Sequence, residues 1–321
     1  MNPENRIIKS KLPADAEGLR LDCYLAKRFT YHSLGKWREL INDGQILIND
    51  GQNTPNDGQC LKSTILRSGD ILTYMPRGLE EPPVDLDYSI VYEDEYLFVI
   101  NKCGNLPCHP SGPFFKHTLW HHISGRYGKI YFINRLDRET SGLLIAARSP
   151  EVAGKFAKQT AQIEKEYRAL VFGDFNKAID ADGYLIKDTA SIVRKKRRFV
   201  FDLSDGAENT SAVKTLLEPV WSKNGFSLVK AILKTGRLHQ IRATLFSLGF
   251  SLVGDKLYGP DDRIYLKIRE DKITGDDWKK LVMRRQALHS YRLGFTHPVS
   301  MEKMEFIASL PNDFILKTGI F

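Results

Sequence analysis

The first part of the chain carries the hydrophobic spacing of helices and then that of strands. Apolar residues recur at helical spacing over 21–25 and over 34–41, and Ser33 stands where a helix cap is expected. The run QILI leads into Asn49-Asp50-Gly51, a tight-turn signal, and GDILTY follows as a further strand. The pattern predicts a small α/β unit over residues 1–75, with two helices, a hairpin and a closing strand.

The rest of the chain follows a proline-rich stretch and is dominated by strand patterns. Residues 76–84 hold three prolines, one glycine and two acids, which is typical of a linker. Beyond it, the segments YSIVYEDEYLFVINK, EYRALVFG and FSLVKAILK are interspersed with helical segments without strict alternation. We therefore predict an α+β domain over 85–321 with a mainly antiparallel mixed sheet. A nucleotide-binding fold is disfavoured, because no GxGxxG, GxxxxGKS or GxxxxGKT motif occurs.

Composition narrows the class of protein. The 321 residues are 42% apolar and 27% charged, close to the average for soluble globular proteins. No stretch approaches the roughly 18 apolar residues of a membrane span, and the first residues lack the apolar core of a signal peptide. The four cysteines have no CxxC spacing, which disfavours a disulfide scaffold or a thiolate zinc site. We expect a cytoplasmic protein with no membrane partner.

Positive charge is concentrated in one part of the chain. The formal net charge is +8, and residues 194–242 hold eleven bases and four acids, whereas residues 80–95 hold seven acids and no base. The basic window opens with five consecutive bases, Arg194, Lys195, Lys196, Arg197 and Arg198. Such a surface gains affinity for a phosphate backbone by counterion release, although a solvated basic loop would show the same run. The distribution favours nucleic acid as the partner.

The segment FINRLDRETSGLLIAAR, residues 132–148, is the most informative about chemistry. It places Asp137 between Arg135 and Arg138, shortly before a run typical of a buried strand. Neighbouring cations lower the pKa of a carboxylate and keep it available as a nucleophile or base at neutral pH. A surface ion pair in front of a core strand would give the same pattern, so the residues alone leave both interpretations open.

Five ordered segments carry the motifs of one known family. NRLDRETSG is similar to the signature HRLDRxTSG, and KEYRALVFG, with Tyr167, is similar to a second block. TGRLHQIRATLFSLGFSLVGDKLYG, with Arg242, and RQALHSYRLGFTHP are similar to later blocks, and VYEDEYLFVINKCGNLPCHP to an opening strand and loop. From about Ile90 to Pro298, the chain therefore resembles the RluA-type RNA pseudouridine synthases.

The first unit also has a relative among known domains. LRLDCYLAKR, SLGKWRELINDGQILIND and LRSGDIL cover about Glu17 to Met75. They resemble the RNA-binding domain named after the fourth protein of the small ribosomal subunit, which commonly precedes a synthase domain of this type. Leu34 stands where that family has an arginine, so contacts from this helix would come from Lys36 or Arg38.

The resemblance implies an isomerase that converts uridine in structured RNA to pseudouridine without a cofactor or a metal. Asp137 would act on the flipped nucleotide as nucleophile or base, and Arg242 would pair with it. Tyr167 would stack on the uracil and assist deprotonation at carbon 5, and Arg135 would fill the vacated stack. Flipping a base costs about a few kcal/mol, which such stacking and phosphate contacts offset.

RNA is the expected partner, with large-subunit ribosomal RNA favoured and transfer RNA left open. A non-catalytic ribosome assembly factor is the alternative, but such a protein would be expected to lack at least one of Asp137, Tyr167 and Arg242. We expect a monomer, since no heptad or long apolar stripe is visible. The residues expected to contact RNA are Arg135, Arg138, Lys36, Arg38, Lys102, Arg194, Lys195, Lys196, Arg197, Arg198, Arg237, His239 and Gln240.

Two residues differ from the family pattern, and three histidines raise the question of a metal. Asn134 replaces the histidine of the signature, which would alter hydrogen bonding in the loop, and Cys103 replaces a proline, which would leave its loop less rigid. His117, His121 and His122 include an i, i+4 pair whose spacing permits a metal, but no HExxH arrangement accompanies the pair. The sequence therefore favours an enzyme without a metal.

Overall fold

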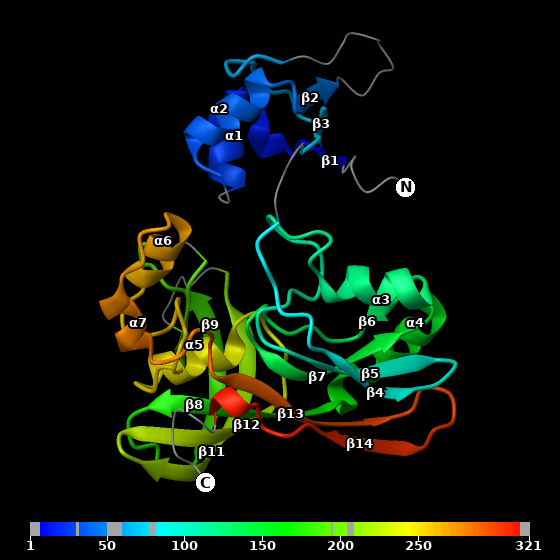
Figure 1. The fold of residues 1–321 in the computed structure, drawn as a ribbon, viewed down its shortest axis with the longest axis vertical. Helices are drawn as coiled ribbons and strands as arrows, with labels where there is room; N and C mark the ends of the chain where they lie inside the picture. Colours follow the sequence, from blue (N-terminus) through cyan, green and yellow to red (C-terminus); the bar gives the residue numbers. More distant parts are fainter. Residues whose placement is uncertain are drawn as a thin grey trace. The chain divides into compact units, whose positions relative to one another are not determined.

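The chain forms two compact units, Met1–Pro82 and Pro83–Phe321 (Figure 1). The computed structural model describes residues 7–29, 32–49, 60–76, 81–193, 195–203 and 209–314. Residues 77–80 of the expected linker, Asp50 and Gly51 of the expected turn, and Arg194 of the expected RNA contacts lie outside these ranges. That the first unit is an RNA-binding domain stays a prediction.

The first unit combines a small antiparallel sheet with short helices. Within the described residues its sheet has the order β1-β3-β2. The elements span Ile8–Lys11 (β1), Ala14–Ala16 (η1, a 3-10 turn), Leu21–Arg28 (α1), Leu34–Asn42 (α2), Ile46–Asn49 (β2) and Ile71–Tyr74 (β3). The two expected helices and the strands β2 and β3 are confirmed. Strand β1 was not predicted, because its sequence IKSK contains a single apolar residue.

Helix α2 shows how local sequence determines this unit. Ser33 caps the helix, since its hydroxyl accepts from the Lys36 backbone N–H at 3.2 Å. Trp37 and Ile41 form its buried face, and the Trp37 side chain is fully covered. The expectation that Leu34 belongs to this face is wrong, because Leu34 is the first helical residue and is 37% exposed. The buried face of α2 therefore begins one turn later, at Trp37, and includes Leu40 as well as Ile41.

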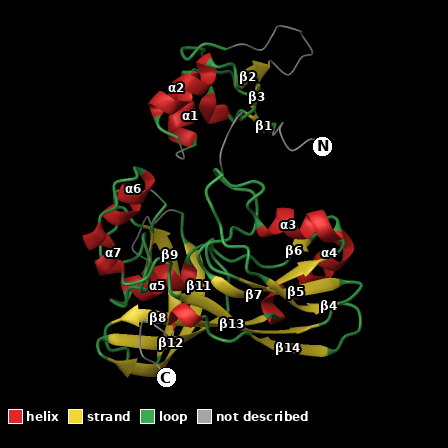
Figure 2. Cartoon of the chain, in the orientation of Figure 1, coloured by secondary structure: helices red, strands yellow, loops and turns green. Residues whose placement is uncertain are grey.

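The second unit is built on one long mixed sheet (Figure 2). Within the described residues the sheet has eleven strands in the order β10-β9-β11-β12-β8-β13-β7-β5-β4, with β14 beside β13 and β6 beside β7. The strands span Ser89–Glu93 (β4), Leu97–Lys102 (β5), Tyr131–Phe132 (β6), Ser141–Ala147 (β7), Glu164–Phe172 (β8), Ile179–Lys187 (β9), Arg197–Val200 (β10), Ser211–Lys223 (β11), Phe226–Leu233 (β12), Leu288–Thr296 (β13) and Lys303–Ile307 (β14). Strands β13 and β7 pair in parallel, and the other named pairs are antiparallel. The α+β class with a mainly antiparallel mixed sheet is therefore confirmed.

Helices pack on both faces of this sheet. They span Leu119–Tyr127 (α3), Pro150–Gln159 (α4), Thr160–Gln162 (η2, a 3-10 turn), Gln240–Ser247 (α5), Arg263–Arg269 (α6) and Gly275–Leu281 (α7). In β7, Leu144 packs in the cluster that contains residues of α3 and α5, whereas Leu143 and Ile145 pack in the cluster that contains residues of α4. All of β7 is buried, which explains its continuous apolar run. Among the described residues, no helix has the length and apolar character needed to cross a membrane.

Candidate active site

The loop between β6 and β7, residues 133–140, carries Asp137 and is held by its backbone. The Arg138 carbonyl accepts from the Leu106 N–H at 3.0 Å and from the Lys102 ammonium at 3.1 Å. The Thr140 N–H donates to the Asp137 carbonyl at 3.1 Å. These bonds fix the loop at the start of β7. They thereby fix the backbone position from which the Asp137 side chain extends.

Gly142 allows this part of the sheet to close tightly. Its φ is +105°, and an added Cβ would lie 2.2 Å from the Ser290 carbonyl oxygen of β13. At this point Ser141 and Gly142 pair in parallel with His289 and Ser290. Glycine is therefore required here, and the tight contact brings the Asp137 loop beside the residues that lead into β13.

Arg242, on α5, bridges two carboxylates. Its Nη1 donates to Asp137 Oδ2 at 2.7 Å. Its Nε and Nη2 donate to Asp255 Oδ2 and Oδ1 at 2.6 and 2.8 Å, a two-pronged contact typical of arginine with a carboxylate. Asp255 is fully buried and also accepts from the backbone N–H groups of Leu257 and Tyr258 at 2.9 Å. Asp255 thus holds the guanidinium, and the guanidinium in turn holds Asp137.

The Asp137 carboxylate is charged and accessible. Burial by itself raises the pKa of Asp137, but the Arg242 charge and the hydrogen bonds from Arg242 and Gln286 bring it below its ordinary value. Gln286 Nε2 lies 3.4 Å from Asp137 Oδ2 and donates to the Thr140 hydroxyl at 2.6 Å. The Asp137 side chain remains 28% exposed. The group is therefore ionised at neutral pH and can be reached by a substrate.

Tyr167, on β8, comes to the same site from a different strand. It is 6% exposed and faces Ser290 across the pairing of β8 with β13. Burial raises the pKa of Tyr167 to about 12, and the negative charge of Asp137 acts in the same direction. The phenol is therefore protonated at neutral pH, and the Asp137 carboxylate lies within electrostatic range of it. Three residues from a loop, a helix and a strand thus form one site.

Several residues expected to contact RNA are on the surface. Lys36 is exposed and pairs with Glu39 at 2.5 Å, and Arg38 donates to the buried Asp22 at 2.9 Å. Arg138 keeps 41% of its side chain exposed. The other surface cations of the set are Arg135, Lys195, Arg198 and Arg237, while Arg197 is half-buried. The structure allows each of these cations to meet a polyanion.

Three expected RNA contacts are corrected by their burial. Lys102 is 1% exposed, burial lowers its pKa to about 8, and its ammonium donates to the carbonyls of Cys103 and Arg138. Lys196 is 4% exposed and lies 3.3 Å from Asp262. The third residue, Gln240, is 3% exposed and bonds within the protein. These side chains support loops, because their polar atoms are already used inside the fold.

His239 has an intermediate position. It is half-buried, and its Nδ1 lies 3.1 Å from the Tyr258 hydroxyl. Burial and the nearby Arg242 charge lower the pKa of His239 to about 4. The imidazole is neutral at physiological pH, so it offers hydrogen bonds and no ionic contact to a phosphate.

Two residues of the site were missed by sequence reasoning. Asp255 lies in the GDKLYG segment and Gln286 in the RQALHS segment, yet neither was singled out. A signal was present, since a buried arginine that pairs with an accessible carboxylate needs a second, buried counter-charge. Asp255 supplies that charge to Arg242, and Gln286 connects Asp137 to Thr140.

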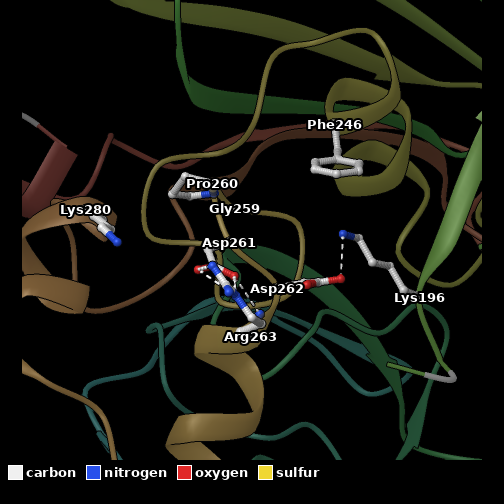
Figure 3. A pocket seen from close by; sticks show the side chains of 8 residues that line it. All are labelled: Lys196, Phe246, Gly259, Pro260, Asp261, Asp262, Arg263 and Lys280. Carbon is white, nitrogen blue, oxygen red and sulfur yellow. Dashed lines mark hydrogen bonds and ion pairs between the residues drawn. The ribbon is translucent and has the colours of Figure 1, made fainter. Parts of the chain in front are cut away.

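A cavity of about 540 Å³ lies close to these residues but does not include them (Figure 3). It is lined by Lys196, Phe246, Gly259, Pro260, Asp261, Asp262, Arg263 and Lys280. Inside it, Lys196 pairs with Asp262 at 3.3 Å and Arg263 pairs with Asp261 at 2.8 Å. Because Asp137, Tyr167 and Arg242 are not among its lining residues, this cavity is separate from the candidate active site.

The departures from the family pattern have local consequences. Asn134 Oδ1 accepts from the Ile145 N–H at 2.8 Å, so this side chain ties the Asp137 loop to β7. The Cys103 thiol donates to the Asp85 carbonyl at 3.1 Å. In the described part of the chain, no group of three or more His, Cys, Asp or Glu side chains is arranged to hold a metal ion.

Comparison with known proteins identifies the family. A family model described as RNA pseudouridylate synthase matches residues 96–247. Over 312 residues the chain is 32% identical to Ribosomal large subunit pseudouridine synthase D of Zymomonas mobilis, covering 93% of this chain and 92% of that protein. The chain belongs to the RNA pseudouridine synthase family. The residues that the family model matches include Asp137, Tyr167 and Arg242.

Other relatives agree with this membership. The synthase is 30% identical to Ribosomal large subunit pseudouridine synthase D of Neisseria meningitidis, covering 97% of this chain and 80% of that protein. Among solved structures, Human RNA Pseudouridylate Synthase Domain Containing 1 matches with a TM-score of 0.54 at 25% identity, covering 72% of this chain and 86% of that one. The match in structure is consistent with the α+β sheet described above.

Proposed function

We propose that this synthase converts uridines of large-subunit ribosomal RNA to pseudouridine and that Asp137 is its catalytic carboxylate. The ribosomal substrate is supported by the names of two relatives that match over most of their length. The catalytic assignment is supported above all by one observation. An accessible carboxylate lies 2.7 Å from a buried guanidinium that a second, fully buried carboxylate holds in place.

The reaction conserves all atoms of the nucleotide. The bond between C1′ of the ribose and N1 of uracil breaks, a bond from C1′ to C5 forms, the hydrogen at C5 leaves as a proton, and N1 carries a proton in the product. Asp137 acts on the flipped nucleotide, either by attacking it or by removing a proton from it, and both routes need the ionised form. Arg242 keeps Asp137 in that form, as the lowered pKa of Asp137 indicates.

Tyr167 and Arg135 complete the proposed site. The Tyr167 ring stacks on the uracil, a role that suits a tyrosine with a protonated phenol. Assistance in removing the C5 proton then requires that RNA binding changes the surroundings of this phenol. Arg135 is exposed on the Asp137 loop and fills the space left in the RNA stack.

Release of tritium from carbon 5 of uridine tests the proposal. Large-subunit ribosomal RNA labelled there should lose tritium to water with the wild-type protein and keep it with Asp137→Ala. Asp182→Ala is the matched control, because Asp182 also pairs with a cation, Lys214 at 2.7 Å, but its side chain is 64% exposed on β9. Equal release by wild type and Asp137→Ala would contradict the assignment of Asp137.

The choice of RNA is tested separately. Ribosomal and transfer RNA from a strain without this gene should be offered in parallel, and release is expected from the ribosomal RNA. Mapping pseudouridines in that strain identifies the missing positions. We also propose that the synthase works as a monomer in the cytoplasm, which sedimentation and cell fractionation test.

A further inference from the structure

The turn before α5 presents a large apolar side chain beside the active site. Leu238 is 65% exposed and stands between the exposed Arg237 and the half-buried His239. It lies four residues before Arg242, which contacts Asp137. A single exposed leucine is common on protein surfaces and by itself indicates no function. A role for Leu238 therefore has to be supported by the residues around it.

Buried Gln240 holds this turn firmly. Its Oε1 accepts from the Arg237 N–H at 3.0 Å and from the Thr235 hydroxyl at 2.9 Å. Its Nε2 donates to two acceptors on β11 at 3.1 and 2.9 Å. His239, the next residue but one after Arg237, adopts φ of 59°, in the left-handed region. The turn is fixed in a conformation that leaves Leu238 facing solvent.

One cation adjoins the exposed leucine, and a second lies near the same turn. Arg237 is its neighbour in the chain, and the basic segment 195–198 approaches through Tyr258. The Tyr258 hydroxyl accepts from the Arg197 N–H at 3.0 Å and lies 3.1 Å from His239 Nδ1. The charge of Lys195 also acts on His239. An exposed apolar side chain that has Arg237 beside it and Lys195 near its turn matches the surface of a nucleic acid, which alternates flat bases with phosphates.

We propose that Leu238 packs against a nucleobase next to the target uridine. This inference rests on the proposed function. When a uridine is flipped, its neighbours lose a stacking partner, and an apolar side chain fixed at that place covers the exposed base. Arg237 and Lys195 contact phosphates on either side. Leu238 thereby acts in addition to Arg135: Leu238 acts from the turn before α5, and Arg135 from the loop that carries Asp137.

The test compares side chains at position 238 on the labelled ribosomal RNA. Leu238→Ala should lower kcat/KM by about tenfold, the scale of a lost base contact. Leu238→Met should retain most of the activity, whereas Leu238→Gln, of similar size but polar, should behave like alanine. Met301→Ala is the control, because Met301 is 63% exposed in the turn between β13 and β14, and it should match the wild type.

Two further measurements separate this role from others. The salt dependence of RNA affinity should be unchanged in Leu238→Ala, whereas Arg237→Gln should reduce the slope by about one. Thermal unfolding of Leu238→Ala should match the wild type, because little of the side chain is buried. A wild-type kcat/KM in both Leu238→Ala and Leu238→Gln would overturn the inference.

Failure of the proposed function would be seen differently. In that case the wild-type protein itself would release no tritium. Binding of the same RNA by wild type and Leu238→Ala would then decide the inference, since a base contact weakens binding even without turnover. Equal affinities would overturn it, and a weaker affinity with an unchanged salt slope would support it.

Discussion

Each unit of the chain holds an aspartate against arginine, but with opposite exposure. In the first unit Asp22 is fully buried, and the two arginines that bind it, Arg20 and Arg38, have side chains 47% and 42% exposed. In the second unit the Asp137 side chain is 28% exposed and that of Arg242 is 10% exposed. The first arrangement presents cations to solvent, and the second presents a carboxylate.

This difference shows that the buried member of an ion pair positions its partner, and that the more exposed member is the one a ligand can reach. The pKa of Asp22 falls to about 2 and that of Asp137 is also lowered, so both carboxylates are ionised at neutral pH. Their charge state is therefore the same, and access differs. Asp22 can only orient its arginines, whereas Asp137 can meet a nucleotide.

Removing the charge of Asp137 should have the largest effect on activity. Asp137→Asn should lower kcat by about a thousandfold or more while the protein stays folded, because the side chain is partly exposed and nearly isosteric. Single-turnover tritium release measures the first quantity and circular dichroism the second. Retained turnover in Asp137→Asn would remove the distinction drawn between the two units.

Removing the buried carboxylate of the second unit should affect stability as well as activity. Asp255→Ala leaves Arg242 buried without its main partner, and breaking a buried pair in this way costs about 3–5 kcal/mol. Urea unfolding of the full chain measures the loss, and Asp182→Ala, on an exposed pair, should change it by less than about 0.5 kcal/mol. If the Asp255→Ala protein were as stable as the wild type but had a displaced Asp137, the role of Asp255 would be to position Asp137 and not to stabilise the fold.

The pH dependence of the first unit sharpens the comparison. The pKa of Asp22 in the folded chain is about 2, against an ordinary value of 3.8. Its contribution to stability is therefore fully present above the ordinary value and is lost as pH falls towards 2. Hydrogen exchange of peptides 7–29 and 32–49 in the full chain should rise over that range. In Asp22→Asn the exchange should already be raised at neutral pH and change less with acid.

The smallest effect is expected at the exposed arginines of the first unit. Arg38→Gln should weaken RNA binding by a few-fold and reduce the salt slope by about one, as loss of a single phosphate contact would. Titration of labelled ribosomal RNA at several salt concentrations measures both. Arg148→Gln serves as a control, since Arg148 lies over the Phe98 ring and pairs with Glu93 in the second unit. Equal losses in both variants would speak against a specific role for the first unit.

The features of this protein that could be predicted from the sequence are those for which local pattern and structure coincide. The cap at Ser33, the buried run of β7 and the main strands of the sheet all follow from spacing and residue type. The RNA contacts predicted at Lys102 and Lys196 are not among them, because both lysines look like surface cations in the sequence but are buried in the fold. Whether a lysine reaches solvent depends on which strands and loops cover it, and neighbours in the sequence do not reveal that.

By itself, the sequence determined the class of fold, the family and the residue types that the chemistry needs, because short segments of the chain carry each of these. The pattern of such a segment can be interpreted without knowing which other segments it contacts. Only the tertiary structure decided that Asp255 holds Arg242 and that Gln286 reaches Asp137. The first contact joins residues 13 positions apart and the second joins residues 149 positions apart, and neither pairing follows from the local pattern of a segment. Charge, burial and access at a site arise from such distant contacts, so packing determines which ionised aspartate is available to act.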